Sequence, residues 1–547
     1  MGVACSGCLQ PAKCIHGLIV KHGQLANVIV GTALLSAYAR CQDCRSSYRV
    51  FSELRSPGLI SYNAMISSFV LNDCFDQAFL LFNKSRNSGL LPDVMTTVSL
   101  VRASTNLLER KLCESVHGLS IKVGLLSDAS VSNSLLSAYS SFGDANHARR
   151  LFEKMKCKDV ISWSTMMSLY IQFGDALEVL KLFNIMRSED LSFDDGVIIN
   201  LISAFALLAD FSKGRQVHAQ VIVSGYCSDV LVMNSVISMY SRCGHLDHSR
   251  GVFDRMAEKS VVSWSAMISG CAQNGCPKEA VSLWTKAKQE VGISLDFVAL
   301  MGVLAASAKL GALELCQQLH GHTFRAGYSH RTTVLNGLIS AYSKCGSMGL
   351  SVAVFREMSC HRDVVSWNAV LSGYALNGSG EEAIRLYEEM REQGVEPDNA
   401  TYLIVLNACS HAALVECGLM IFRKMTNESG ITPNEHHFGC LVDLFARAGL
   451  LRDASCLANN LCGTASPEMW KPLLSGCVAH GDVELAELAS AKLVELGAEG
   501  SERVVLLSNA YSSQGRYQEA QELRWTVDEK GMRKNPGISS VLGTSLR

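Results

Sequence analysis

Two pairs of cysteines in this chain have a spacing at which their thiols could bind a metal ion. Cys5-x-x-Cys8 and Cys41-x-x-Cys44 each have the spacing of half a zinc site, which needs four thiolate or imidazole ligands. The position of Cys41 recurs further along the chain, where it is occupied by Phe142, Cys243 and Cys345. Because phenylalanine takes the same place, a small packing site is the favoured interpretation. We expect the protein to bind no metal and no cofactor.

Catalytic motifs are missing from the sequence. Cytidine deamination by a zinc enzyme requires His-x-Glu with a downstream Pro-Cys-x-x-Cys, because the zinc activates water and the glutamate moves the proton. The sequence contains no His-x-Glu, no Walker loop, no G-x-S-x-G motif and no Rossmann glycine pattern. His117, His218 and His320 recur at one position of a repeat, which favours a core or capping role over catalysis. We therefore expect that the protein is not an enzyme.

Composition limits the classes of partner. The 49 basic and 51 acidic residues give a net charge of −2, which argues against wrapping duplex DNA and leaves single-strand binding open. With 48% apolar residues the chain can bury a large core. Its 21 cysteines are spread along the sequence, so we expect reduced thiols. The most apolar stretch, residues 197–211, is interrupted by polar side chains, and we expect no membrane span.

A long repeat must position all of these residues. Ser-aromatic pairs end in Tyr62, Trp163, Trp264 and Trp367, which lie 101, 101 and 103 residues apart. Histidines 16, 117, 218 and 320 lie 101, 101 and 102 residues apart, and an Ala-Tyr or Met-Tyr series at Tyr38, Tyr139, Tyr240 and Tyr342 has the same spacing. Three independent markers with one period establish a repeat.

Each long period contains three shorter units of about 31 to 36 residues. In residues 364–398, apolar side chains follow helical spacing twice, and Gly378 to Gly380 separates the two predicted helices. A helix-turn-helix unit of this kind cannot bury its apolar face alone. We therefore predict an all-α fold in which the units stack as a right-handed superhelical solenoid.

The unit VVSWNAVLSGYALNGSGEEAIRLYEEMREQGVEPD, residues 364–398, resembles a near-consensus pentatricopeptide repeat. The mixture of long, short and ordinary repeats resembles the plant subclass that carries them in triplets. After the repeats, VLLSNAYSSQGRYQEAQELRWTVDEKGMRKNPG, residues 505–537, is similar to the E motifs of that subclass. Residues 538–542 depart from the family pattern, and no DYW-type deaminase domain follows. The chain is thus identified as an E-type member.

The resemblance implies a division of the chain. Residues 1–27 resemble part of a long repeat, so the chain is expected to begin inside a unit, with its N-terminus truncated. Residues 28–466 form thirteen repeats, residues 467–500 a first, tetratricopeptide-like E motif, residues 501–540 a second E motif, and residues 541–547 a C-terminal tail. The predicted repeats are 28–58, 59–93, 94–128, 129–159, 160–194, 195–229, 230–260, 261–296, 297–331, 332–363, 364–398, 399–434 and 435–466.

In this family the fifth residue of a repeat and its last residue read one RNA base together. The resemblance assigns this role to the pairs Asn63 with Asp93, Asn133 with Asp159, Ser164 with Asp194, Asn234 with Ser260, Ser265 with Asp296, Asn336 with Asp363, and Asn368 with Asp398. Long repeats carry the apolar Val98, Ile199, Met301 and Leu403 at the fifth position. Apolar second residues, namely Ile60, Ile161, Leu231, Val262 and Val365, are expected to lie between adjacent bases.

A structural interpretation of these pairs stands beside the functional one. Polar residues on an outward helix face are normally solvated, and a repeat-terminal Asp is a common helix N-cap. The register favours base reading, because Asn or Ser takes the fifth position in seven of the nine short and ordinary repeats and in none of the four long ones. If these side chains were merely solvated, nothing would exclude Asn and Ser from the fifth position of the long repeats.

The resemblance implies a sequence-specific factor for C-to-U RNA editing in an organelle. Its expected partners are single-stranded organellar RNA, a separate trans-acting deaminase and accessory editing factors, with the protein itself a monomer. RNA splicing or stability is the neighbouring alternative, and a protein-binding helical scaffold is the alternative from another class. The expected location is the mitochondrion, with the chloroplast as the alternative.

The first residues fit no targeting signal of that kind. Residues 1–27 contain lysine but no arginine, so we expect that this chain lacks a transit peptide. Met1 to Ser6 match the myristoylation pattern, with Cys5 as a second lipid site, but the expected truncation favours an internal start over a lipidated terminus.

Overall fold

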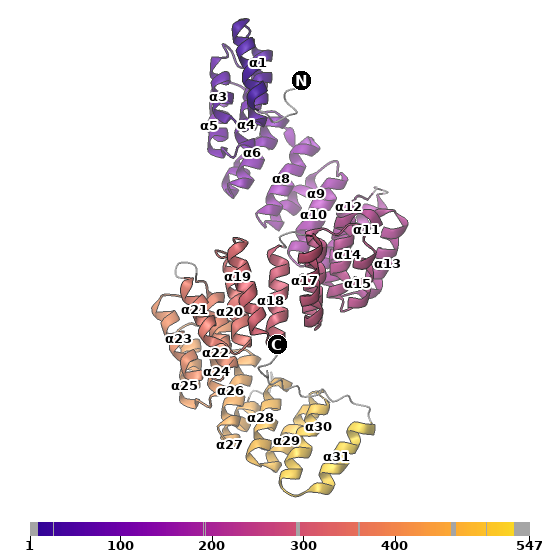
Figure 1. Ribbon diagram of the computed structural model, residues 1–547, viewed down its shortest axis with the longest axis vertical. Helices are drawn as coiled ribbons and strands as arrows, with labels where there is room; N and C mark the ends of the chain where they lie inside the picture. The colour runs from indigo at the N-terminus through magenta and orange to yellow at the C-terminus, as the bar shows by residue number, and fades with distance from the viewer. Residues whose placement is uncertain are drawn as a thin grey trace. The chain divides into compact units, whose positions relative to one another are not determined.

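The computed structural model describes residues 9–25, 27–189, 191, 193–291, 296–358, 362–460, 466–498 and 500–529 (Figure 1). These residues form α-helices, short 3-10 helices and loops, and no β-strand occurs among them. The predicted all-α class is therefore confirmed. None of the described helices is both long enough and apolar enough to cross a lipid bilayer. The chain divides into two compact units, Met1–Glu258 and Lys259–Arg547, each of which we describe by itself.

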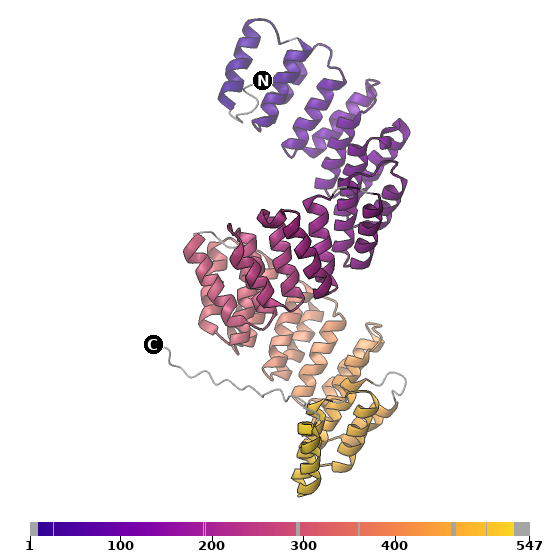
Figure 2. The same cartoon turned by 90° about the vertical axis from the view of Figure 1, so that its right-hand side faces the viewer.

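The described residues of the N-terminal unit form one helix followed by seven helical hairpins, which Figure 2 shows from a second direction. Its helices are α1 (Leu9–Lys21), α2 (Val28–Arg40), α3 (Cys44–Glu53), α4 (Leu59–Leu71), α5 (Phe75–Asn87), α6 (Val94–Asn106), α7 (Arg110–Val123), η2 (Leu125–Ser127), α8 (Ala129–Ser141), α9 (Ala145–Lys154), α10 (Val160–Gln172), α11 (Ala176–Ser188), α12 (Asp195–Leu207), α13 (Phe211–Val223), η3 (Tyr226–Ser228), α14 (Val230–Arg242) and α15 (Leu246–Arg255).

The C-terminal unit repeats the same hairpin in its described residues. Its helices are α16 (Val261–Gln273), α17 (Pro277–Val291), α18 (Phe297–Leu310), α19 (Leu313–Arg325), α20 (Thr332–Lys344), α21 (Met348–Glu357), α22 (Val364–Leu376), α23 (Gly380–Glu392), α24 (Asn399–His411), α25 (Val415–Asn427), α26 (Glu435–Arg447), α27 (Leu451–Asn460), α28 (Pro467–His480), α29 (Val483–Glu495), α30 (Ser501–Ser513) and α31 (Tyr517–Glu529).

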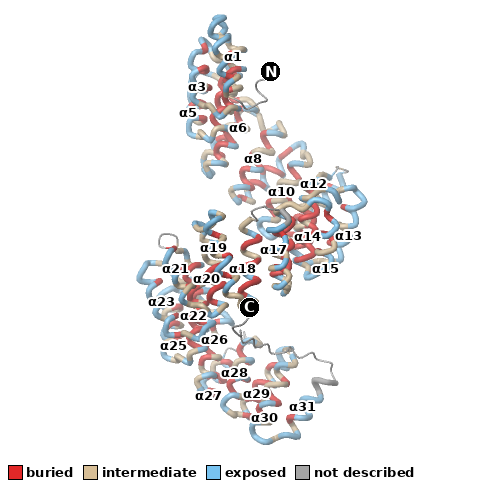
Figure 3. Tube along the Cα trace, in the orientation of Figure 1, coloured by how far each residue is buried: buried red, intermediate tan, exposed pale blue. Residues whose placement is uncertain are grey.

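Within each unit the hairpins stack as a solenoid. The first helix of a hairpin packs against its own second helix and against the first helix of the next hairpin, as α4 does against α5 and α6. Buried residues follow the faces where helices touch, and exposed residues cover the opposite faces (Figure 3). The predicted stacking of helix-turn-helix units is thus confirmed for both units.

The hairpin of α22 and α23 illustrates how local sequence sets the boundaries. Asp363 caps the start of α22 by accepting a hydrogen bond from the Ser366 backbone N–H at 2.8 Å. Helix α22 ends at Leu376, and Gly378 then adopts a φ of 73°, a left-handed conformation that glycine enters without steric cost. Helix α23 begins at Gly380, so the predicted break between the helices is confirmed.

The Ser-aromatic marker of the sequence joins neighbouring hairpins. Trp163 is 2% exposed and meets Phe152 of the preceding α9 edge-on, with ring centroids 4.9 Å apart. Trp367 is fully buried and meets Phe355 of α21 in the same way at 4.8 Å. Edge-to-face packing of this kind stabilises a core beyond its buried area. The period near 101 residues therefore reflects one packing contact, which recurs between a short repeat and the ordinary repeat after it.

The other two markers form a second joint. Each recurring histidine lies within hydrogen-bond distance of the tyrosine 22 residues later. The distance from histidine Nδ1 to the phenol oxygen is 2.9 Å for His16–Tyr38, 2.8 Å for His117–Tyr139, 2.9 Å for His218–Tyr240 and 3.0 Å for His320–Tyr342. Burial lowers the pKa of histidines 117, 218 and 320. Each of these three histidines is half-buried and contacts a buried tyrosine, a position that fits the core or capping role predicted from the sequence.

Helices α28 to α31 continue the same core past the last predicted repeat. Trp470 and Leu473 of α28 share one apolar cluster with Val442 of α26 and Leu451 of α27. The first E region is therefore packed directly onto the preceding hairpin. Several features predicted from the sequence lie outside the described residues, namely Cys5-x-x-Cys8, the N-terminal lipidation pattern, residues 538–542 and the tail at 541–547.

Candidate nucleic-acid interface

The fifth-position side chains lie one turn into the first helix of each hairpin. The N-terminal unit carries Asn63 on α4, Asn133 on α8, Ser164 on α10 and Asn234 on α14. The C-terminal unit carries Ser265 on α16, Asn336 on α20 and Asn368 on α22. Because first helices of successive hairpins pack side by side, these positions form a row within each unit.

The repeat-terminal residues begin the first helix of the next hairpin. Asp93, Asp159, Asp194, Ser260, Asp296, Asp363 and Asp398 are the N-caps of α6, α10, α12, α16, α18, α22 and α24. Each side chain accepts a hydrogen bond from a backbone N–H three residues further on. The capping role considered from the sequence is therefore present at every one of these positions.

Five of the caps also hold a fifth-position side chain directly, and one of them is Asp363, to which Asn336 donates. The donor and acceptor atoms lie 2.7 Å apart for Asn63–Asp93, 3.0 and 2.9 Å for Asn133–Asp159, 2.6 Å for Ser265–Asp296 and 3.2 Å for Asn368–Asp398. In each case the Asn amide nitrogen or the Ser hydroxyl donates and the carboxylate accepts. One carboxylate thus caps a helix and fixes the polar side chain of the preceding repeat.

Hydrogen bonds keep these carboxylates ionised. Burial by itself would raise the pKa of Asp159, but hydrogen bonds from Ser162 and Asn133 outweigh it and lower that pKa below its usual value. The same balance lowers the pKa of Asp363, with Ser366 and Asn336 as donors, and of Asp398, with Thr401 and Asn368 as donors. At neutral pH each pair therefore presents amide N–H groups beside an acceptor that carries negative charge.

Two predicted pairs are arranged differently. Ser164 and Asp194 share no hydrogen bond in the described structure, although Ser164 Oγ and Asp194 Oδ1 lie 2.8 and 3.4 Å from the place that a Cβ at Gly196 would take. Asn234 and Ser260 belong to different units. Asn234 is 5% exposed in the N-terminal unit, and Ser260 caps α16 in the C-terminal unit.

Large apolar side chains protrude at the second position of the same helices. Their exposed fractions are 77% for Ile60, 59% for Ile161, 60% for Leu231, 51% for Val262 and 60% for Val365. Side chains of this size normally contribute to a core. Their exposure three residues before the polar row gives the base of each first helix an alternation of apolar and polar groups that suits contact with both the faces and the edges of nucleobases.

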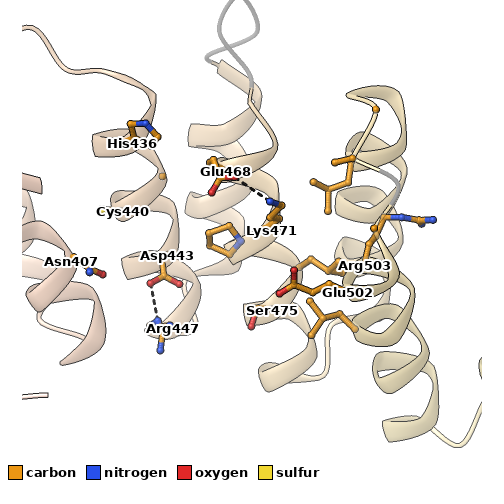
Figure 4. Close-up of a pocket in the computed structure, with 18 of the residues that line it drawn as sticks. Asn407, His436, Cys440, Asp443, Arg447, Glu468, Lys471, Ser475, Glu502 and Arg503 are labelled. Carbon is orange, nitrogen blue, oxygen red and sulfur yellow. Dashed lines mark hydrogen bonds and ion pairs between the residues drawn. The ribbon is translucent and has the colours of Figure 1, made fainter. Parts of the chain in front are cut away.

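A groove continues the row in the C-terminal unit. It has a volume of about 970 Å³ and is lined by residues of α24, α26, α28 and α30, including Gly439 and Lys471 at the fifth position of their helices (Figure 4). Two ion pairs in it join neighbours on one helix, Arg447 with Asp443 at 2.8 Å and Lys471 with Glu468 at 3.1 Å, and Arg503 donates to Ser490 Oγ at 2.7 Å. The groove offers space without a polar reading pair, and the sequence pattern could not reveal it because Gly439 has no side chain.

A second hydroxyl group joins the row at two places. Thr96 of α6 donates its hydroxyl hydrogen bond to Asn63 Oδ1, and Thr401 of α24 lies 2.7 Å from Asn368 Oδ1. Both threonines are buried at the third position of the repeat that follows the asparagine. Neither threonine was predicted from the sequence, although Ser or Thr recurs at that position of the repeats.

The described residues contain one cluster with the ligand types of a metal site. Glu114, Asp144 and His147 bring carboxylate and imidazole atoms within 4.8 Å of one another. Arg110 already fills the place of a cation, since its guanidinium lies 2.6 Å from Asp144 and 2.8 Å from Glu114. The geometry favours a structural ion-pair cluster.

The recurring cysteine position is a helix end. Cys41, Cys243 and Cys345 are the C-cap residues of α2, α14 and α20, and Phe142 is the C-cap residue of α8. Cys345 lies 3.7 Å from Cys316 of the preceding hairpin, and burial raises the pKa of the Cys345 thiol to about 12. Cys345 therefore lies at a helix end against a neighbouring hairpin, a position that fits the packing site inferred from the sequence.

The sequence matches known repeat families. Residues 362–411 match the PPR repeat family, residues 480–542 match the E motif, and the PPR repeat also matches at 60–90, 130–160, 161–191, 232–261, 262–290 and 333–362. The fold is similar to that of the pentatricopeptide repeat protein PPR10 solved in complex with an 18-nt psaJ RNA element. That comparison has a TM-score of 0.57 and 16% identity, and it covers 92% of this chain and 84% of the other.

Relatives of Arabidopsis thaliana align with almost the whole chain. A putative pentatricopeptide repeat-containing protein is 34% identical over 541 residues, which cover 99% of this chain and 78% of the relative. Another pentatricopeptide repeat-containing protein is 33% identical over 544 residues, which cover 98% of this chain and 83% of the relative. A third, described as chloroplastic, is 32% identical over 97% of this chain, and the chain spans only 61% of its length.

Proposed function

The chain belongs to the pentatricopeptide repeat family, and from this premise we propose that it binds single-stranded RNA sequence-specifically and directs C-to-U editing in an organelle. The observation that carries the proposal is the row of Asn and Ser side chains hydrogen-bonded to capping carboxylates. Helical-repeat proteins of this kind read one unstacked base per repeat through such polar groups. The RNA element in the PPR10 complex supports RNA as the ligand.

An Asn–Asp pair is complementary to the Watson–Crick edge of uracil. The Asn368 amide nitrogen uses one hydrogen for Asp398, and its second hydrogen can donate to a uracil carbonyl oxygen. The carboxylate of Asp398 can accept the N3–H of the same base. Cytosine has a lone pair at N3, which the carboxylate repels. We therefore assign U as the preferred base to the repeats of Asn133, Asn336 and Asn368, and likewise a pyrimidine with U preferred to the repeat of Asn63.

A Ser–Asp pair suits guanine for a related reason. Guanine offers a carbonyl acceptor next to an N–H donor, as uracil does, but the base is larger. Ser265 is shorter than Asn and its hydroxyl already points at Asp296, which leaves room for a purine. We assign G to the repeats of Ser164 and Ser265. The pair of Asn234 with Ser260 replaces the carboxylate by a hydroxyl that can donate or accept, so C or U is assigned there.

These assignments predict a target sequence. Read with the N-terminal repeat at the 5′ end, the repeats from Asn63 onward specify pyrimidine, any base, U, G, any, C or U, G, any, U and U. Two unspecified bases and three spacer bases then precede the edited C. The long repeats leave a base unspecified because Val98, Ile199, Met301 and Leu403 can neither donate nor accept a hydrogen bond.

The E region is proposed to recruit a separate deaminase, with accessory editing factors, to the bound transcript. Residues 480–542 match the E motif, and within them Tyr517 and Trp525 of α31 are each 69% exposed. Exposed aromatic side chains are typical anchors of protein interfaces. In this proposal the chain is a monomeric, non-enzymatic factor of the mitochondrion or the chloroplast, and two of the relatives are described as chloroplastic.

Binding to RNA is tested with the full chain and a synthetic RNA of the predicted sequence. We expect tight binding to the single strand, weaker binding when both predicted G positions are changed to C, and no measurable binding to the same sequence as a duplex. The dependence of the affinity on salt concentration measures how many phosphate contacts the repeats make. Equal affinity for both single strands would contradict sequence reading. An absence of RNA binding would favour the protein-binding scaffold instead.

The editing role has a separate test in cells that lack the protein. The double variant Tyr517→Ala and Trp525→Ala should bind the target RNA normally and fail to restore editing. Leu177→Ala, which changes a side chain of 61% exposure on α11, is the matched control and should restore editing fully. Editing restored by the double variant would remove these aromatics from the interface. Normal editing without the protein, but altered transcript abundance or splicing, would favour the splicing or stability role.

A further inference from the structure

Each Asn of the reading row is followed by a hydroxyl residue at the third position of the next repeat. Asn63, Asn133, Asn234, Asn336 and Asn368 are followed by Thr96, Ser162, Ser263, Ser366 and Thr401, respectively. Where the fifth residue is Ser, as in Ser164 and Ser265, the third residue of the next repeat is Val197 or Ala299. All seven helices begin with the same kind of cap, so the cap does not explain where the hydroxyl occurs. Among these seven, the hydroxyl occurs only where the preceding repeat has Asn at its fifth position.

Threonine and serine use this hydroxyl differently. Thr401 Oγ1 lies 2.7 Å from Asn368 Oδ1 and 2.8 Å from Asp398 Oδ1, so its single hydroxyl hydrogen is shared between the two acceptor oxygens of the reading pair. Thr96 bridges Asn63 and Asp93 in the same manner. Both threonines are at most 1% exposed. The two ordinary repeats that carry Asn thus contain a closed triad of amide, carboxylate and hydroxyl.

The serines of the other repeats leave the triad open. Ser162 Oγ donates to Asp159 Oδ1 at 2.7 Å, and Ser366 Oγ donates to Asp363 Oδ1 at the same distance. The Oδ1 atoms of Asn133 and Asn336 are buried and have no hydrogen-bond partner in the described structure. A buried carbonyl without a donor is destabilising, and it leaves the amide held from one side only.

We propose that Thr96 and Thr401 are positioning residues that set how strictly the preceding repeat distinguishes U from C. This inference rests on the proposed RNA-reading function. The carboxylate requires the amide nitrogen on its side, and the threonine hydroxyl donates to the amide oxygen on the other side, so the amide cannot turn over. Its free N–H then always faces the base. At Asn133 and Asn336 the amide lacks the second restraint, and a turned amide would present an acceptor to the N4–H of cytosine.

The test compares two threonines of the same helix. Thr96→Val removes the bridging hydroxyl, whereas Thr105→Val removes a hydroxyl of α6 that donates only to the Val101 carbonyl oxygen at 2.8 Å. Affinities of the full chain are measured for two RNAs that differ by U or C at the base read by Asn63. We expect Thr96→Val to lower the ratio of U affinity to C affinity by about two- to tenfold, the range of one net hydrogen bond. Thr105→Val should leave the ratio at the wild-type value.

Two further variants keep the inference falsifiable if the valine variant does not fold. Thr96→Ser retains a hydroxyl that can turn toward Asp93, as Ser162 does toward Asp159, and should also lower the ratio. Ser366→Thr supplies the missing bridge to Asn336 and should raise the ratio at the base of that repeat. If the wild type clearly prefers U, and folded Thr96→Ser and Ser366→Thr keep the wild-type ratios, the proposed role of the third residue is overturned. The proposed base reading is not overturned by that result. A wild-type protein without any U preference at these bases would overturn the proposed reading and this inference with it.

Discussion

His117 Nδ1 lies 2.8 Å from the phenol oxygen of Tyr139, which belongs to the next hairpin. The contact recurs as His218–Tyr240 and His320–Tyr342, so half-buried imidazoles make one recurring contact between hairpins. Burial lowers the pKa of all three histidines, which means that the folded state binds their protons less readily than the unfolded chain does.

The first prediction follows from the sign of these shifts. Stability contributed by the neutral histidines is fully present above the unfolded pKa of about 6.5 and is lost as the pH falls below it toward the lowered folded values. The melting temperature should therefore be flat above about pH 7 and decline below about pH 6.5. Replacing histidines 117, 218 and 320 by Asn should flatten that decline. A melting temperature that rises on acidification would contradict the assignment.

The second prediction concerns a reading pair. Asn368→Ser should shift the preferred base of its repeat from U toward G, because Asp398 is retained and the shorter side chain leaves room for a purine. The loss on the original RNA should be about two- to tenfold, since one neutral hydrogen bond contributes about 0.5 to 1.5 kcal/mol. Fluorescence anisotropy with U and G variants of the RNA measures the shift.

Its control lies at the end of the same helix. Asn377 caps α22, and its amide donates to the Ser343 and Gly373 carbonyl oxygens. Asn377→Ser should lower stability without changing the order of base preferences. If U and G affinities moved together in Asn368→Ser, that repeat would not read the base.

The third prediction concerns the exposed apolar row. Ile60→Ser should weaken RNA binding for every sequence about equally, because an apolar contact to a base face does not distinguish bases. Stability should change by no more than about 0.5 kcal/mol, as expected for a side chain that is 77% exposed. Leu80→Ser, on the second helix of the same hairpin and 62% exposed, is the matched control and should bind RNA normally. Equal losses in both variants would indicate a general effect on the hairpin.

The fourth prediction concerns the groove in Figure 4. Gly439→Asn should be tolerated, because a Cβ there meets the Glu468 carbonyl oxygen at 3.4 Å, an ordinary contact, and Asn has a better helix propensity than Gly. With Ser466 as the repeat-terminal residue, the new Asn should give a pyrimidine preference to a base that is now unread. Binding-site selection with the variant and the wild type measures it. Gly418→Asn is the contrast, since a Cβ there would lie 2.4 Å from Leu444 Cδ2 and should destabilise the fold.

The fifth prediction concerns chemistry. The purified protein alone should neither deaminate cytidine nor hold stoichiometric zinc, because the sequence has no His-x-Glu and Arg110 occupies the acidic cluster at Asp144. Elemental analysis and an editing assay without added deaminase check both points. One tightly bound zinc per chain, or editing by the isolated protein, would overturn the proposal of a non-enzymatic factor.

The fold could be predicted from the sequence because its markers report local joints. Trp163 and Trp367 recur since each fills the same buried site against a preceding Phe, and His117 recurs since it meets the same Tyr. Helix ends could also be predicted, as at Gly378, because a left-handed turn favours glycine. Such signals lie within one or two units and do not depend on distant parts of the chain.

The detail of the reading row was harder to predict. Thr96 lies 33 residues after Asn63, and whether a hydroxyl turns to the amide or to the carboxylate depends on the rotamer that Thr or Ser adopts at the helix start. The missing hydrogen bond between Ser164 and Asp194 likewise depends on side-chain placement that a pattern of residue types does not record. The residue types at the two repeat positions predicted which side chains are neighbours, but side-chain packing determines which of these neighbours form a hydrogen bond.

The hydrogen bond between Thr96 and Asn63 crosses the border at which repeats are customarily divided. A designer who exchanges residues 59–93 as one block would therefore bring along the amide and the carboxylate but leave the bridging hydroxyl behind. A block that runs from the fourth residue of one repeat to the third residue of the next keeps all three groups together. Cut points for chimeras and synthetic arrays of this protein belong one turn inside the first helix rather than at the loop before it.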